Sequence, residues 1–375
     1  MLTWIEIDTS AARHNIEAFR GILPTGTSLM VVVKANAYGH GLGIYGPIAA
    51  AHADWLGVNA LDEALELRAL GIAKPVAILG HTEPDQLDTV VANDFRQVVY
   101  RTDIAAGLSK AAQRQNKTAH IHLKLETGTN RQGIPLTELP GLVHQIRAMP
   151  GVEIEGAYTH FANIEDTLDP SFAERQLANF REALATLQQA GVRLTQIHAA
   201  ATAGTLLYPE TGFSMIRLGI GAYGIWPSRE TQLAARERGR RITLIPAMTW
   251  KTRVAQIKTV EAGEHVSYGL TYQASHRMQV AVLPIGYYDG YDRKLSNCGR
   301  VLIRGRAVPV IGRVAMNMTM VDVTDVSAQP DDEVVLIGRQ GSAEIRAEEL
   351  AEKIGTIAYE VVTRINPRIR RIASG

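Results

Sequence analysis

The chain has 375 residues, more than the roughly 250–300 at which single cores tend to split, so two domains are expected. Hydrophobic residues make up 46% and charged residues 21%, as in an ordinary soluble globular protein. The 39 Lys and Arg residues nearly balance the 38 Asp and Glu residues, and the net charge of +1 indicates neither a nucleic acid nor a membrane surface as partner.

The N-terminal segment carries Glu6 and Asp8, where a signal peptide needs basic and then purely apolar residues. No stretch approaches the ~20 apolar residues of a membrane span. The single cysteine, Cys298, excludes an internal disulfide framework and fits a reducing compartment. We therefore expect a cytoplasmic protein.

The first strong element is the apolar run at residues 29–33, which leads directly into Lys34 and a glycine-rich turn at 35–41. Burying a lone ammonium is costly, so a core strand rarely carries a lysine without a purpose. The same burial lowers the pKa of the lysine and makes its amine nucleophilic, which suits Schiff-base chemistry. The alternative is a lysine that extends to solvent at a strand end.

Strand-like and helix-like segments then alternate up to about residue 230. Helical spacing is found at residues 61–70, 138–149 and 175–190. Eight strand-then-helix units over about 190 residues predict a (β/α)8 barrel, and a doubly wound open sheet is the alternative because pattern alone does not show closure. The predicted strands are residues 29–34, 55–58, 76–79, 97–100, 120–126, 154–160, 196–199 and 214–219.

The pattern changes after Arg229. A charged stretch at 236–241 is followed by short strand-like runs between Gly, Pro and Asp turns, with little helix until 346–354. This predicts a mainly antiparallel β domain, so we expect a barrel over residues 1–235 and a β domain over 236–375. The strand-like runs are residues 254–257, 279–284, 301–303, 308–311, 319–323 and 333–337.

Strand alternation predicts a polar inner face for the barrel. In residues 120–126 it places His120, His122, Lys124 and Glu126 on one face. Polar groups from several strands converge near the C-terminal mouth, where active sites of this architecture lie, unless they only satisfy one another. The converging groups are Lys34, Lys124, Tyr158, His160 and Arg217.

Other common site motifs are absent from the sequence. The histidines lack metal-binding spacing, and we predict no metal. There is no G-x-S-x-G elbow, and residues 39–43 do not match the dinucleotide fingerprint G-x-G-x-x-G.

Residues 33–41, V-K-A-N-A-Y-G-H-G, closely resemble the pyridoxal-phosphate attachment motif of alanine racemases. Further motifs of that family follow in order and at family spacing, so the resemblance extends along the chain. It implies a pyridoxal-phosphate-dependent amino-acid racemase with a barrel and a C-terminal β domain. The further motifs are residues 124–131 (KLETGTNR), 159–162 (THFA), 217–220 (RLGI), 266–269 (VSYG), 285–290 (IGYYDG), 312–317 (GRVAMN) and 359–360 (YE).

The resemblance implies that Lys34 carries the cofactor covalently, that His160 packs against its ring and that Arg217 faces the ring nitrogen. An arginine there disfavours protonation of that nitrogen, so the ring is a weaker electron sink and transamination is suppressed. Arg131 is implied to contact the phenolic oxygen and the substrate carboxylate. The implied phosphate ligands are Tyr38, Tyr359, Thr202 and the backbone N–H groups of Gly219 and Ile220.

Racemisation removes a proton from one face of Cα and returns one on the other, which one base per face achieves directly. The resemblance implies Lys34 as the base for D-alanine and Tyr268, supplied by a second subunit, as the base for L-alanine. Tyr287 and Met316 are implied to come from that subunit and to bind substrate, so a homodimer with composite active sites follows. Lys124 resembles a lysine that many members carry as a carbamate, which supports Arg131.

The chain departs from the family pattern in a few places. It has Ala201-Thr202 where Asn-Ser is common, Ala315 for cysteine and Asn317 for aspartate, and residues 366–371 lack the usual Val-Pro-Arg. None of these changes removes a catalytic group.

The function implied by the resemblance is alanine racemase, supplying D-alanine for peptidoglycan. One alternative is a racemase for serine or another amino acid. The other is a non-catalytic pyridoxal-phosphate-carrier barrel, against which the second domain with Tyr268 argues.

Overall fold

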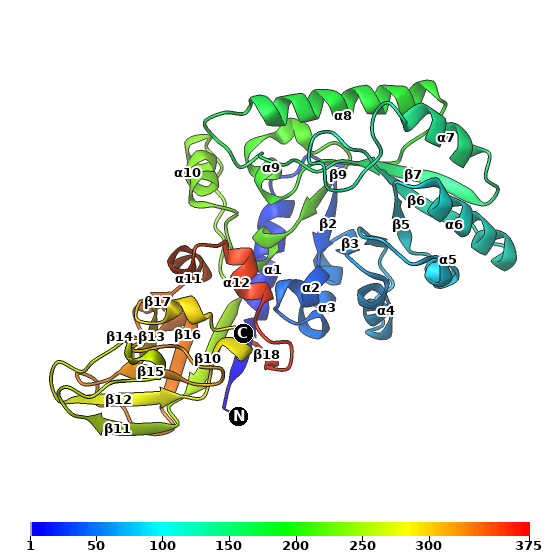
Figure 1. Cartoon of the computed structure of the whole chain (residues 1–375). Helices are drawn as coiled ribbons and strands as arrows, with labels where there is room; N and C mark the ends of the chain where they lie inside the picture. The colour runs from blue at the N-terminus through cyan, green and yellow to red at the C-terminus, as the bar shows by residue number, and fades with distance from the viewer. Residues whose placement is uncertain (1) are drawn as a thin grey trace. The chain divides into compact units, whose positions relative to one another are not determined.

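The computed structural model describes residues 2–375 and contains a closed barrel of eight parallel strands (Figure 1). Closure is direct, because the first barrel strand pairs in parallel with both the second and the last, with Met30 opposite Trp55 and Arg217. The predicted (β/α)8 barrel is confirmed, and the open sheet is excluded. The strands are β2 (Ser28–Val32), β3 (Trp55–Val58), β4 (Val76–Ile78), β5 (Arg96–Val99), β6 (Ala119–Lys124), β7 (Val152–Tyr158), β8 (Gln196–His198) and β9 (Met215–Leu218).

Helices alternate with these strands, as the sequence periodicity predicts. The longest, α8 (Ser171–Gln189), buries Ala173, Leu177 and Phe180 at three- and four-residue intervals, which is why it packs as an amphipathic helix. Among the described residues, the other helices that precede the C-terminal part are α1 (Thr9–Arg20), α2 (Lys34–Tyr38), α3 (Leu42–His52), α4 (Leu61–Ala69), α5 (Leu87–Ala92), α6 (Thr102–Gln115), α7 (Leu139–Arg147), α9 (Thr202–Leu207) and α10 (Arg229–Glu237). Within residues 2–375, no helix combines the length and apolar character needed to cross a bilayer.

The C-terminal part is built from two sheets. The larger has the order β14-β13-β16-β10-β1-β18, with β17 paired to β16, and the smaller has the order β11-β12-β15. Val260, Val266, Met278, Val280 and Ile311 form an apolar cluster in this part. The strands are β1 (Trp4–Asp8), β10 (Met248–Arg253), β11 (Gln256–Val260), β12 (Met278–Leu283), β13 (Arg300–Ile303), β14 (Arg306–Pro309), β15 (Thr319–Asp322), β16 (Glu333–Gln340), β17 (Ala343–Ile345) and β18 (Arg370–Ser374).

The compact units differ from the two contiguous segments predicted from the sequence. One unit, the β unit, comprises the N-terminal residues up to Ala12, Asn36–Tyr45 and Pro246–Gly375, and the other, the barrel unit, comprises Arg13–Ala35 and Gly46–Ile245. The N-terminal strand belongs to the β unit because it pairs antiparallel with β10 and parallel with β18. The strand predicted at residues 254–257 is wrong in its bounds, because β10 ends before it and β11 begins within it.

The backbone after β2 makes a left-handed turn. The predicted strand 29–34 ends early, and the short helix α2 (Lys34–Tyr38) follows. Its last four residues have φ between 51° and 55°, although none is glycine. Each such residue costs roughly 1–2 kcal/mol, so the turn needs support. Glu63 accepts a hydrogen bond from the N–H of Ala35 at 2.5 Å, and Asn36 Oδ1 accepts one from Leu42 at 2.8 Å.

Gly39, directly after this turn, is expected to tolerate no side chain. Its φ is +79°, and a Cβ would lie 2.0 Å from the carbonyl oxygen of Val362. We expect Gly39→Ala to lower the free energy of unfolding by about 3 kcal/mol, measured by urea denaturation. Gly43→Ala is the control, because nothing lies within 4 Å of the added Cβ at this position in α3 (Leu42–His52). Equal effects of the two substitutions would contradict this account.

Candidate active site

Lys34 lies just beyond the C-terminal end of β2 and is partly buried. Burial lowers the pKa of its ammonium, and the charges of Arg131 and Arg217 lower it further, while the carboxylate of Glu63 opposes them. A lowered pKa leaves more of the amine neutral and nucleophilic. The structure thus places a partly buried lysine with a lowered pKa just beyond the C-terminal end of the first barrel strand.

Arg217, in β9, is held in one orientation by hydrogen bonds in the barrel interior. Its Nη2 donates to the carbonyl oxygens of Thr159 and Ala199 at 2.8 and 2.9 Å. Its Nη1 donates to the carbonyl oxygen and to Nδ1 of His198 at 3.0 and 2.8 Å. The Nδ1 of His160 lies 3.2 Å from Nη2. A guanidinium with this many partners points in a fixed direction.

The charge of Arg217 affects two further residues predicted for the site, His160 and Lys124. Burial, followed by the charge of Arg217, lowers the pKa of His160 well below its ordinary value, so this ring is neutral. Lys124 is 1% exposed, and its Nζ donates to the carbonyl oxygen of Leu125 at 3.1 Å. Burial and the charge of Arg217 lower the pKa of Lys124 to about 7. Arg131, in the loop after β6, is exposed.

Thr202, Gly219 and Ile220 lie where the last two barrel strands end. Thr202 begins α9 directly after β8, and its Oγ1 accepts a hydrogen bond from the N–H of Gly221 at 3.3 Å. A Cβ on Gly221 would lie 2.7 Å from Thr202 Cγ2, so the turn needs glycine to approach this closely. A hydroxyl beside a turn of backbone amides suits an anionic group such as phosphate, and barrels of this type often bind phosphate here.

The β unit carries the other five predicted site residues, Tyr38, Tyr268, Tyr287, Met316 and Tyr359. The ring centroids of Tyr38 and Tyr359 lie 6.3 Å apart. The segments of Tyr287 and Met316 are adjacent, because the N–H of Tyr287 donates to the carbonyl oxygen of Ala315 at 3.1 Å. Tyr268, Tyr287 and Met316 are 73%, 41% and 55% exposed, so this unit presents large side chains outward.

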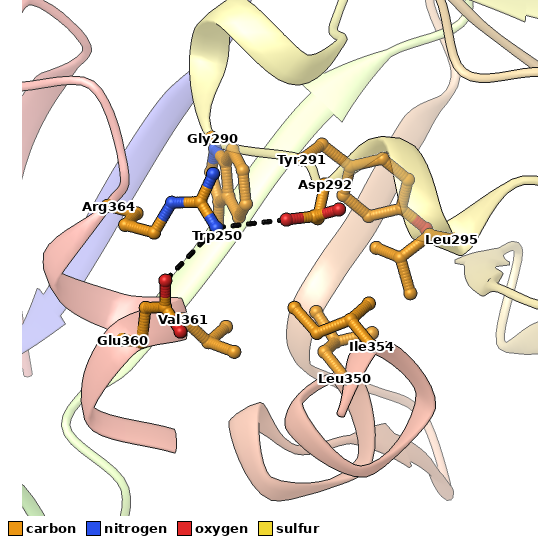
Figure 2. A pocket seen from close by; sticks show the side chains of 10 residues that line it. All are labelled: Trp250, Gly290, Tyr291, Asp292, Leu295, Leu350, Ile354, Glu360, Val361 and Arg364. Atoms are coloured by element: carbon orange, nitrogen blue, oxygen red, sulfur yellow. Dashed lines mark hydrogen bonds and ion pairs between the residues drawn. The ribbon is translucent and has the colours of Figure 1, made fainter. Parts of the chain in front are cut away.

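A small pocket in the β unit lies beside the helix that carries Tyr359, α12 (Ala358–Thr363) (Figure 2). Arg364 forms ion pairs with Asp292 at 3.0 Å and with Glu360 at 3.3 Å, which ties the end of α12 to a neighbouring turn (Figure 2). The cavity volume of about 10 Å³ corresponds to about one water molecule, so this pocket is too small for an amino acid.

The chain matches two family models over nearly its whole length. Residues 7–227 match the alanine racemase N-terminal domain, and residues 247–373 match the alanine racemase C-terminal domain. The chain belongs to the alanine racemase family. A relative from Symbiobacterium thermophilum named alanine racemase is 42% identical, covering 100% of this chain and 97% of its own length.

Solved structures agree with this assignment. The alanine racemase from Bacillus anthracis with bound L-Ala-P has a TM-score of 0.93 and 35% identity, covering 100% of this chain and 95% of that one. The histidine racemase from Leuconostoc mesenteroides subsp. sake has a TM-score of 0.89 and 28% identity, covering 100% and 98%. The alanine racemase family uses pyridoxal phosphate.

The residues of the barrel unit fit that cofactor. An aldehyde needs an amine with a lowered pKa, which Lys34 supplies. The anionic phosphate needs hydrogen-bond donors, and the Thr202 hydroxyl, which accepts from the N–H of Gly221, can donate its own proton to it. Among residues 2–375, no group of three or more His, Cys, Asp or Glu side chains is arranged to hold a metal ion.

The sequence reasoning missed several residues that support this site. Glu63 supports the turn after Lys34, and His198 contacts the guanidinium of Arg217. His198 carried a recognisable signal in the sequence, since it lies in a predicted barrel strand four residues before Thr202. Glu63 carried none, because its partner is a backbone N–H that becomes available only through the left-handed turn.

Proposed function

We propose that this chain interconverts L-alanine and D-alanine by two-base proton transfer at Cα. The supporting observation is the partly buried amine of Lys34 near the fixed guanidinium of Arg217 at the barrel mouth. When bound, pyridoxal phosphate makes the Cα proton of an amino acid acidic enough for side-chain bases to remove.

Two side chains exchange the proton. Lys34, whose lowered pKa favours the neutral amine, takes the Cα proton of D-alanine on its face. Tyr268 takes the Cα proton of L-alanine on the opposite face. In each direction of the reaction, the other of the two residues, in its protonated form, donates a proton to Cα. Arg131 binds the substrate carboxylate as a bidentate donor.

The remaining residues of the proposed site hold the cofactor. Arg217 presents a donor to the ring nitrogen and thereby disfavours its protonation, and the neutral ring of His160 packs against the pyridine. The proposed phosphate ligands are Tyr38, Tyr359, Thr202 and the backbone N–H groups of Gly219 and Ile220.

The exposure of Tyr268, Tyr287 and Met316 supports a homodimer with composite sites. Large exposed apolar side chains are often found where a protein meets a partner. We propose that a second copy of the chain receives these three residues in its barrel mouth, with Tyr287 and Met316 contacting the substrate. We propose that the enzyme works in the cytoplasm, where it supplies D-alanine as a precursor of peptidoglycan.

Exchange of the α-proton of each alanine enantiomer in D2O, followed by NMR together with optical rotation, tests this function. We expect both enantiomers to exchange and to racemise. Exchange of neither, with cofactor bound at Lys34, would disprove alanine as substrate. A panel of amino acids from serine to histidine then separates another racemase from a carrier protein, and the histidine racemase among the structural neighbours makes that panel necessary.

Lys124 is predicted to form a carbamate. A neutral amine attacks the carbon of CO2 and releases one proton, and a pKa of about 7 leaves the amine largely neutral above that pH. We expect the carbamate signal in ¹³C NMR with labelled bicarbonate to grow as the pH rises through about 7, and to be absent in Lys124→Met. Absence of the signal from the wild type at about pH 8 would refute the prediction.

A further inference from the structure

A continuous row of polar side chains leads away from Arg217 through the barrel interior. Nη1 of Arg217 lies 2.8 Å from Nδ1 of His198, whose Nε2 lies 3.0 Å from Nδ1 of His122. Nε2 of His122 lies 3.4 Å from Oε2 of Glu155, which also accepts a hydrogen bond from Nε of Arg96 at 3.0 Å. These five residues, here called the interior row, come from β9, β8, β6, β7 and β5.

The two ends of the interior row impose one direction on its hydrogen bonds. Arginine only donates, so Nδ1 of His198 must accept and its proton must lie on Nε2. That N–H donates to Nδ1 of His122, which leaves the His122 proton on Nε2, where it donates to the carboxylate of Glu155. A carboxylate only accepts, so Glu155 fixes the same direction from the other end.

Both imidazoles are neutral, as this arrangement requires. Burial, followed by the charge of Arg217, lowers the pKa of His198 well below its ordinary value, and burial also lowers that of His122. The pKa of Glu155 is lowered to about 2: although burial raises it, the hydrogen bonds from His122 and Arg96 prevail, and the group stays ionised.

The two rings are held in place by aromatic neighbours. Tyr158 stacks on His198 with a centroid distance of 4.7 Å and an interplanar angle of 1°, and Trp55 lies 5.6 Å from His122. The orientation of each ring is therefore restricted, and what can still change is which ring nitrogen carries the proton. When Glu155 is replaced by leucine, the Nε2–H of His122 loses its acceptor, and Arg96 at this end can only donate. This end of the row then favours protons on Nδ1, and that shift turns an N–H of His198 against the N–H of Arg217.

We propose that Glu155 is a positioning residue for Arg217: it fixes the tautomers of His122 and His198 so that Arg217 keeps its orientation toward the cofactor ring. The role of Arg217 rests on the proposed function. A catalytic histidine held in the wrong tautomer loses activity although its position is unchanged. A donor such as Arg217 is expected to be affected in the same way when the histidine beside it changes tautomer. Loss of Glu155 is therefore expected to change the chemistry at the ring and not only the stability.

Three variants separate this role from a general structural one. Glu155→Leu removes the acceptor, whereas Glu155→Gln keeps an acceptor oxygen and removes the charge. Glu153→Leu is the matched control, because Glu153 lies on the same strand and pairs with the more exposed His120 at 3.5 Å.

The first measurement is the ¹⁵N chemical shifts of His122 and His198 in the holoenzyme, which report the tautomer without turnover. We expect both rings to carry the proton on Nε2 in the wild type, in Glu155→Gln and in Glu153→Leu. In Glu155→Leu we expect protons on Nδ1, kcat lower by about 10-fold with little change in KM, and more transamination per turnover.

Several results would overturn the proposal. One is a wild type in which His122 and His198 carry their protons on Nδ1. Another is a Glu155→Leu variant with unchanged tautomers or unchanged kcat. A third is a Glu155→Gln variant whose kcat is as low as that of Glu155→Leu. If Glu155→Leu does not fold, the wild type and Glu155→Gln decide by their tautomers and kcat. Expected tautomers in a protein that racemises no amino acid would instead disprove the proposed function and leave the row as a structural feature only.

Discussion

Lys34→Ala is expected to abolish covalent attachment of pyridoxal phosphate and to lower kcat/KM by about 10⁴-fold, the upper range for loss of a general base. The variant removes the nucleophile for the cofactor and the proposed base for D-alanine together. Borohydride reduction followed by mass spectrometry of the peptide around residue 34 measures attachment, and a racemisation assay measures kcat/KM.

Lys110→Ala is the control for this variant, because Lys110 is an exposed lysine of α6 in the same unit. It should leave attachment and rate unchanged. A Lys34→Ala enzyme that still binds the cofactor covalently would show that another lysine holds it, and the proposed site would then be wrong.

Tyr268→Phe is expected to slow α-proton exchange of L-alanine by about 10²–10³-fold while D-alanine still exchanges in D2O. The substitution removes one hydroxyl and keeps the ring, so the remaining contacts of Tyr268 are preserved. D-alanine still exchanges because its proposed base, Lys34, acts on the other face of Cα and is unchanged in this variant. Enantiomer-resolved exchange measured by NMR checks the result.

Tyr288→Phe serves as the matched control, because Tyr288 is also exposed in the β unit and has no proposed part in proton transfer. Equal losses for both enantiomers in Tyr268→Phe would show that Tyr268 positions the substrate without acting as a base. No loss for either would remove it from the mechanism.

The barrel was predictable because its signals are local. Each buried strand is a short apolar run, and each helix repeats apolar residues every three or four positions, as in α8. The candidate residues Lys34, His160 and Arg217 were inferred from the same local signals, since strand ends and alternation predict that they lie on the inner face at the barrel mouth.

Other features depend on residues far apart in the chain. The first strand, Trp4–Asp8, gave no sign that it would pair with residues near 250 and 370. The left-handed turn after Lys34 has no glycine in its first four residues, so propensity argues against it. The strand predicted at residues 254–257 failed because a short apolar run does not show where one strand ends and the next begins.

The sequence by itself determined the alternation of strands and helices, the lysine after the first barrel strand and the family resemblance, because apolar periodicity and motif spacing are properties of the chain. Only the tertiary structure decided that the barrel closes and that Glu63 supports the turn after Lys34. It alone also decided that Arg217, His198, His122, Glu155 and Arg96 form the interior row with one direction. The direction of that row depends on which donors and acceptors meet across five strands, and a linear sequence does not specify those meetings.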